Sequence, residues 1–150
     1  MSDATAASTL QSGRDWAKRG SWSNALICFE HALNLLLRED AYPRQMLNVE
    51  LLLSRAHYEL KNYAAAEEHV RNAIGLELEL FGPDSIDGNE YRTFLVLVLL
   101  GQQRNIDAER EAKRAHRTAM RLRPLNRDHV DRCYATLRVA RSAMRGEVVL

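Results

Sequence analysis

Apolar and polar residues alternate with a helical period along most of the chain. In one stretch, Ala25, Phe29 and Ala32 fall four and three positions apart, which places them on one face of a helix. Short polar segments, or segments with Gly and Pro, separate such stretches. The pattern predicts seven helices, over about residues 4–19, 23–38, 43–60, 64–81, 85–102, 106–122 and 126–145.

Two of the breaks carry clear stop and start signals. The segment Phe81–Ser85 holds a Gly that ends a helix, a Pro that cannot continue it, and an Asp or Ser to cap the next helix. The segment Arg123–Asn126 repeats this logic, with Asn126 as the cap. Residues Asp40–Pro43 form a weaker boundary. We therefore expect the helices to group in pairs between these boundaries.

The pairs repeat in sequence. The alanine-rich segment that begins at Ala25 recurs from Ala66 and again from Ala108, at nearly equal intervals. An independent marker, the series Leu53, Leu95 and Leu137, recurs at the same interval. Small residues at the alanine positions allow two helices to approach closely. The sequence thus predicts stacked helix pairs in one domain over 1–150, with repeats over about 4–40, 43–82 and 84–123 and a capping helix over about 126–146.

These repeats resemble the tetratricopeptide repeat (TPR). The second repeat matches best, through Leu53, Ser54, the Asn62–Tyr63 turn, and Ala66 and Ala73. The first matches through Gly13, Trp16, Gly20, Trp22, Ala25, Phe29 and Ala32. The third keeps Leu95, Ala108 and Ala115, but has Gln103 in place of the usual turn Gly and Asn105 in place of the usual aromatic residue. The repeat is longer than the common TPR unit and is similar in length to the long repeats of kinesin light chains.

The resemblance implies an all-α superhelix, or α-solenoid, whose concave groove binds a peptide or helix of a partner protein. In that family the first helix of each pair lines the groove. The positions projected onto it here are Arg14, Lys18, Asn48, Arg55, Tyr58, Glu59, Leu97 and Leu100. A peptide with acidic residues and an apolar anchor would suit such a groove, with Arg14 and Arg55 contacting the acids and Leu97 and Leu100 the anchor.

Other interpretations of these positions remain open. Each polar residue could belong to a solvated helix face, and Tyr58 could belong to the core. The run Phe94–Leu100 is apolar on every helical face, as in a helix that is buried all round. The carboxylate clamp that some TPR proteins use for chaperone tails is absent, because its positions hold Leu10, Arg14 and Leu52. An adaptor, chaperone or regulator of another partner is therefore the leading prediction.

The charge distribution suggests an alternative. The net charge is +1, but residues 1–90 carry 8 basic and 14 acidic side chains, whereas residues 91–150 carry 13 and 6. A basic stripe follows one face of the sixth predicted helix, formed by Arg110, Arg114, Arg117 and Arg121. It could bind anions or nucleic acid. Beyond Phe94, however, only Tyr134 could stack on a base, so a solvated face or an acidic protein partner is favoured over nucleic acid.

Composition and motifs point away from catalysis. The pairs Cys28 with His31 and His129 with Cys133 have helical spacing for two metal ligands, but neither has a third ligand at a recognisable spacing. Phosphate-loop, dinucleotide and zinc-protease motifs are absent. We expect no enzyme, no metal and no cofactor. Two cysteines suggest a reducing compartment such as the cytoplasm, and the longest apolar run is too short for a membrane span.

The end of the sequence leaves a structural role open. Residues Leu137–Gly146 align with the first helix of a fourth repeat, and no second helix follows. A capping helix explains this pattern. Alternatively, the helix and the apolar residues Val148–Leu150 dock onto a second copy of the chain, which would give a homodimer.

Overall fold

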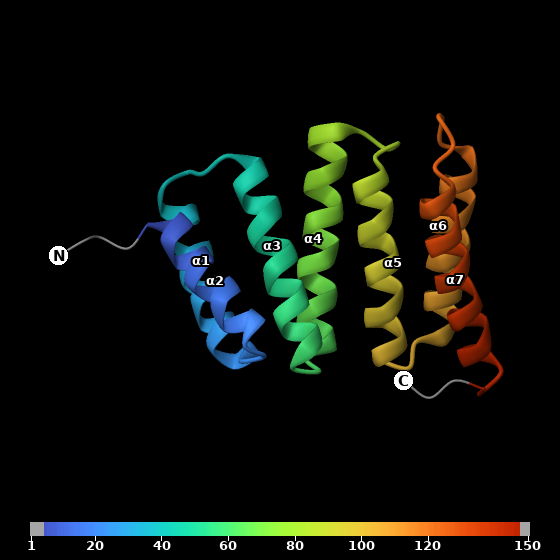
Figure 1. The fold of residues 1–150 in the computed structure, drawn as a ribbon, viewed down its shortest axis with the longest axis horizontal. Coiled ribbons are helices and arrows are strands. Elements are labelled where there is room, and N and C mark those ends of the chain that lie inside the picture. Colours follow the sequence, from blue (N-terminus) through green and yellow to red (C-terminus); the bar gives the residue numbers. More distant parts are fainter. Residues whose placement is uncertain (1–4, 148–150) are drawn as a thin grey trace. The chain divides into compact units, whose positions relative to one another are not determined.

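The protein was analysed as a computed structural model, which describes residues 5–147. These residues form seven α-helices and no strand (Figure 1). The helices are α1 (Ala6–Lys18), α2 (Trp22–Arg38), α3 (Pro43–Glu59), α4 (Tyr63–Phe81), α5 (Ile86–Gly101), α6 (Asn105–Arg121) and α7 (Arg127–Met144). The all-α prediction is confirmed, and every predicted helix is present with its ends close to their expected places.

The chain divides into two compact units, and the division falls inside α4. The first unit comprises Met1–Leu76 and the second comprises Glu77–Leu150. In the first unit, α2 packs against both α1 and α3. In the second, α5, α6 and α7 all pack against one another. The single-domain organisation expected from the sequence stays a prediction.

The turns inside the helix pairs share one backbone conformation. Gly20, Lys61 and Gln103 have φ values of 77°, 62° and 58°, in the left-handed region. Their spacing along the chain equals that of Ala25, Ala66 and Ala108, so the turn follows the sequence repeat. Only glycine adopts this conformation without steric cost, because a β carbon crowds the following carbonyl. Lys61 and Gln103 thus hold a strained turn that Gly20 holds freely.

The predicted caps are also present. Ser85 precedes α5, and its hydroxyl accepts a hydrogen bond from the backbone N–H of Gly88 at 3.1 Å. Asn126 precedes α7, and its side-chain oxygen accepts from the backbone N–H of His129 at 3.0 Å. Each cap satisfies a backbone donor that would otherwise have no partner at the helix start.

The core of the first unit forms around Phe29 of α2, which is 1% exposed. Gly13 of α1 faces this ring so closely that a β carbon added to it would lie 2.7 Å from Phe29 Cδ1. The repeated alanines are buried in both units, as the sequence predicted: Ala25, Ala32, Ala66, Ala73, Ala108 and Ala115 are all 0% exposed. Close helix approach therefore depends on small residues in each pair.

The core of the second unit is centred on α5. The buried residues of its apolar run are Leu95, Val96, Val98, Leu99 and Leu100, while Phe94 and Leu97 are half-buried. The run thus belongs mainly to the core, as its apolar residues on every helical face indicated.

Candidate functional site

The first unit brings two of the predicted groove residues together. Arg14 of α1 donates a hydrogen bond to the side-chain oxygen of Asn48 of α3, at 3.3 Å. Both residues are half-buried, and 34 positions separate them in sequence. The first helices of two successive pairs therefore lie within side-chain reach, as a shared binding surface requires.

The other predicted residues of this unit also lie on α1 and α3. Lys18 is exposed. Arg55 forms an ion pair with Glu59 at 2.8 Å, with its side chain 57% exposed, and its guanidinium carbon lies 5.9 Å from the centre of the Trp22 ring. Glu59 partly neutralises Arg55, so the net charge of this surface comes chiefly from Arg14 and Lys18.

Tyr58 of α3 is half-buried and packs edge-on against Tyr63, with ring centres 5.6 Å apart. Burial raises the pKa of its hydroxyl, and nearby Tyr63 and Glu59 raise it further. The hydroxyl is therefore neutral at physiological pH and can act only as a hydrogen-bonding group.

The two predicted apolar anchor residues belong to α5 of the second unit. Leu100 is only 5% exposed and so is part of the core. Leu97 is half-buried and retains some accessible surface. Any apolar contact offered by this pair thus comes mostly from Leu97.

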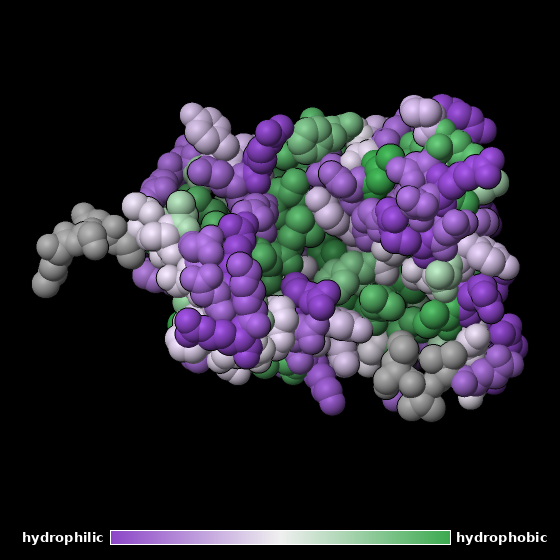
Figure 2. Space-filling model, viewed as in Figure 1, coloured by the Kyte–Doolittle hydropathy of each residue, from purple (hydrophilic) through white to green (hydrophobic). Residues whose placement is uncertain are grey.

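The basic stripe of α6 is neutralised at its two ends. Arg110 approaches Asp107 at 3.5 Å, and Arg121 approaches Asp84 at 4.0 Å. Within residues 5–147, neither Arg114 nor Arg117 has an ion pair or a hydrogen bond. Figure 2 shows mostly hydrophilic residues over the upper part of α6 and α7. The middle of the stripe thus carries the uncompensated charge.

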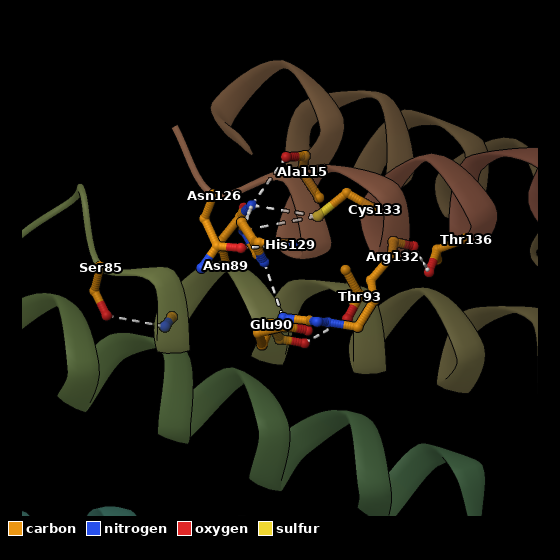
Figure 3. Close-up of polar contacts among 11 residues, drawn as sticks. Ser85, Asn89, Glu90, Thr93, Ala115, Asn126, His129, Arg132, Cys133 and Thr136 are labelled. Carbon is orange, nitrogen blue, oxygen red and sulfur yellow. Dashed lines mark hydrogen bonds and ion pairs between the residues drawn. The ribbon is translucent and has the colours of Figure 1, made fainter. Parts of the chain in front are cut away.

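A buried polar cluster between α5, α6 and α7 was not predicted (Figure 3). Asn89 of α5 is 3% exposed, and its side-chain N–H groups lie 2.9 Å from the carbonyl oxygen of Ala115 and 2.9 Å from His129 Nε2. On the other side of the ring, His129 Nδ1 lies 2.9 Å from the carboxylate of Glu90. Because the Asn89 nitrogen can only donate, Nε2 is the accepting nitrogen and Nδ1 carries the proton.

Glu90 is shared by two partners. It accepts from His129 and from Arg132 Nε, the latter at 2.8 Å. Burial acts to raise the pKa of the Glu90 carboxyl, but the hydrogen bonds from Arg132 and His129 outweigh it and hold the pKa below its ordinary value of 4.5. The carboxylate is thus charged at neutral pH and ties α5 to α7.

Cys133, His129 and Glu90 are arranged like a nucleophile, a base and an orienting carboxylate, but the cysteine is not activated. Cys133 Sγ lies 3.8 Å from His129 Nε2. The cysteine is 0% exposed, and burial raises the pKa of its thiol to about 11. A nucleophilic cysteine instead needs a lowered pKa and access to substrate. Among residues 5–147, no three or more His, Cys, Asp or Glu side chains are arranged to hold a metal ion.

A second polar cluster, between α3 and α4 of the first unit, was also missed. Glu50 is 7% exposed, and its carboxylate contacts His69 Nδ1 at 2.6 Å and the Asn72 side-chain nitrogen at 3.5 Å. His57 stacks on His69 with ring centres 5.4 Å apart. Burial and the neighbouring His69 lower the pKa of His57, although Glu30 and Glu68 oppose the shift.

The comparisons with known proteins define the class of fold. Neither a known family model nor a curated protein matches the sequence. The structure shows a TPR-like helical repeat fold, since it closely matches a solved helical-repeat structure. That structure is BtubC (BKLC) from P. vanneervenii, a kinesin light chain-like protein. The TM-score is 0.84 at 14% identity, over 95% of this chain and 57% of the BtubC chain. Within residues 5–147, the helices are too short or too polar to cross a membrane.

Proposed function

We propose that this chain is a protein-interaction module, an adaptor, chaperone or regulator without catalytic activity, that binds an acidic segment of a partner protein through its first unit. The hydrogen bond between Arg14 and Asn48 carries this proposal, because it joins α1 and α3 into one surface. Arg14, Lys18 and Arg55 supply cations there, and Asn48 and Tyr58 supply neutral hydrogen-bonding groups. TPR-like folds bind proteins far more often than they catalyse reactions, which supports this class of function.

Arginine suits this role for a physical reason. Its planar guanidinium donates two parallel hydrogen bonds to one carboxylate. Losing such a contact costs about 1–3 kcal/mol of binding free energy where water is excluded, and little where the side chain stays solvated. Arg14 is half-buried and Arg55 is mostly exposed, so we expect Arg14 to contribute more. In the second unit, Leu97 is the proposed contact for an apolar residue of the partner.

The test compares two charge-matched double variants. Tagged wild type, Arg14→Glu/Arg55→Glu and the control Arg38→Glu/Lys61→Glu would be probed with an array of peptides that vary in Asp and Glu content. The control residues are exposed and belong to the same unit. Acidic peptides should bind wild type and control, and should lose at least tenfold in affinity for the groove variant. Equal loss in both double variants, or binding that ignores acidic content, would contradict the proposal.

Two other roles remain as secondary candidates. The uncompensated charge of Arg114 and Arg117 favours anion or nucleic-acid binding by α6, which increasing salt would weaken strongly. Self-association through the last helix involves Val148–Leu150, which lie outside the described residues. Truncation after Gly146 should abolish a homodimer if that role is correct. The two unpaired cysteines, Cys28 and Cys133, support a cytoplasmic location.

A further inference from the structure

Three repeat positions bring polar side chains together in the first unit, and the equivalent positions of the second unit hold residues of different charge. Moving along the chain by one repeat takes Glu50 to Arg92, His69 to Glu111, and Asn72 to Arg114. In both units the first of these positions lies on the first helix of a pair, and the other two lie on the second helix. The same place in the repeat therefore holds one carboxylate with a histidine and an asparagine in the first unit, and two arginines with one carboxylate in the second.

In the first unit the negative charge at this place is provided by the chain itself. The Glu50 carboxylate is nearly buried and receives His69 at 2.6 Å and Asn72 at 3.5 Å. Asn72, which corresponds to Arg114, thus contacts an oxyanion in this unit. Those contacts compensate the cost of burying the carboxylate.

In the second unit the one carboxylate among these three positions, that of Glu111, stands against two guanidinium groups. Arg92 is half-buried, and its pKa is lowered first by burial and then by the nearby charge of Arg114, with only Glu111 opposing. Within residues 5–147, neither Arg92 nor Arg114 has a hydrogen bond or an ion pair. Arg114 is exposed and keeps its hydration, whereas Arg92 is half-buried beside this second positive charge, which is unfavourable for Arg92 in the free protein. An anion between them would remove that cost.

We propose that Arg92 and Arg114 bind an oxyanion of the phosphate class between α5 and α6. A phosphate group has enough acceptor oxygens for two arginine forks at once, and its second negative charge matches the second guanidinium. Arg117 lies about one helical turn beyond Arg114 and, within residues 5–147, also has no ion pair or hydrogen bond, so its charge strengthens the attraction. The phosphate group is supplied either as a free ion or on a phosphorylated side chain of a partner protein. This site uses other helices than the first-unit surface, so it does not depend on that proposal.

The probe is inorganic phosphate, titrated against chloride at constant ionic strength. Guanidinium N–H signals in NMR spectra would locate the binding, and thermal unfolding would report its effect on stability. Arg92→Met and Arg114→Gln remove the two proposed ligands. Arg110→Gln is the matched control, because it removes the same charge from α6 at a residue that already contacts Asp107. A phosphoserine peptide, compared with its unphosphorylated form, is the second probe.

Phosphate should shift the Arg92 and Arg114 signals of wild type and raise its Tm above the chloride value. Either ligand variant should weaken phosphate binding at least tenfold, while Arg110→Gln should change it less than twofold. Without phosphate, Arg92→Met should be at least as stable as wild type, because it removes an uncompensated charge. Tighter binding of the phosphopeptide than of free phosphate would identify the source as a modified partner, and equal or weaker binding would identify the free ion.

Three results would overturn the site. The first is a phosphate response no larger than that of chloride. The second is an equal loss of phosphate binding in Arg110→Gln, which would mean that only the general charge of α6 matters. The third is a lower Tm of Arg92→Met in phosphate-free buffer, because it would reveal a stabilising contact of Arg92 inside the protein.

Discussion

The two units solve the same packing problem with opposite choices of side chain. In α1 and α2, Gly13 faces Phe29. The equivalent positions two repeats further along, in α5 and α6, hold Val96 and Ala112, both 0% exposed. The large residue is thus on the second helix in the first unit and on the first helix in the second unit. The repeat conserves the combined volume at a helix contact rather than the residue on either side.

Charge is not conserved in the same way. The buried polar cluster of the first unit lies between α3 and α4. That of the second unit lies between α5, α6 and α7. A volume mismatch is penalised at every close helix contact. A polar cluster is tolerated wherever its donors and acceptors find partners, so its position can differ between repeats.

The largest expected effect comes from breaking the Gly13 and Phe29 pair. Phe29→Ala should lower the free energy of unfolding by about 3–5 kcal/mol, because it empties a buried ring site. Gly13→Val alone should also destabilise, since its side chain would clash with the ring. The double variant copies the second unit, so its cost should be at least about 1 kcal/mol below the sum of the two. Urea unfolding followed by circular dichroism measures all three, and strict additivity would disprove the volume exchange.

Removing the amide of Asn89 should have the next largest effect. Asn89→Ala leaves Nε2 of His129 without its Asn89 donor inside the core, and removes the side-chain donor to the carbonyl of Ala115. We expect a loss of about 1–3 kcal/mol in unfolding free energy. Asn24→Ala is the control, because that amide is exposed and contacts only Ser21. A change of equal size in both variants would mean that the cluster adds nothing to stability.

The two histidine clusters should separate in their pH dependence, with a smaller effect. The folded pKa of His57 lies below 6.5, so the unfolded chain takes up this proton first and stability falls as the pH drops below 6.5. The folded pKa of Glu90 lies below 4.5, so its contribution is complete above that pH and is lost only under more acidic conditions. The free energy of unfolding, measured from about pH 7 to pH 3, should fall in two steps. His57→Gln should remove the step at higher pH, and Glu90→Gln should remove the step at lower pH. Unchanged profiles would contradict these assignments.

The smallest effect concerns the left-handed turns. Gln103→Gly should raise the free energy of unfolding by about 0.5–1 kcal/mol, since relief of the strained φ exceeds the added freedom of the unfolded chain. Gly20→Ala should act in the opposite direction at the equivalent turn of the first unit. Thermal unfolding distinguishes the two signs. A destabilised Gln103→Gly would show that the glutamine side chain itself supports the turn.

Much of the fold could be predicted because its signals are local or strictly periodic. Ser85 and Asn126 cap helices through atoms three positions away, and the alanines recur with the repeat. The polar clusters could not be predicted from one helix at a time. Asn89 and His129 are far apart in sequence, and each is unremarkable until two helices are placed together. Comparing residues one repeat apart would have drawn attention to Glu50 and Arg92.

The predicted binding residues show the same limit. Arg14 and Asn48 could be placed on one surface because helical spacing and the resemblance both assign them to first helices, and they do contact each other. Leu100 was misleading, since on a helix that is apolar all round, periodicity does not separate a groove residue from a core residue. The assignment of these residues to partner binding stays a prediction.

The burial of Cys133 makes its thiol a probe of how the second unit opens. Cys28 of the first unit is half-buried, whereas Cys133 is sealed inside its cluster and holds its proton. A thiol reagent added to the native protein can therefore label Cys28 sooner, because it reaches Cys133 only when α7 separates from α5 and α6. The labelling rate at Cys133 thus reports opening of the second unit, and a ligand that holds these helices together would be detected as a slower rate, whatever its chemistry.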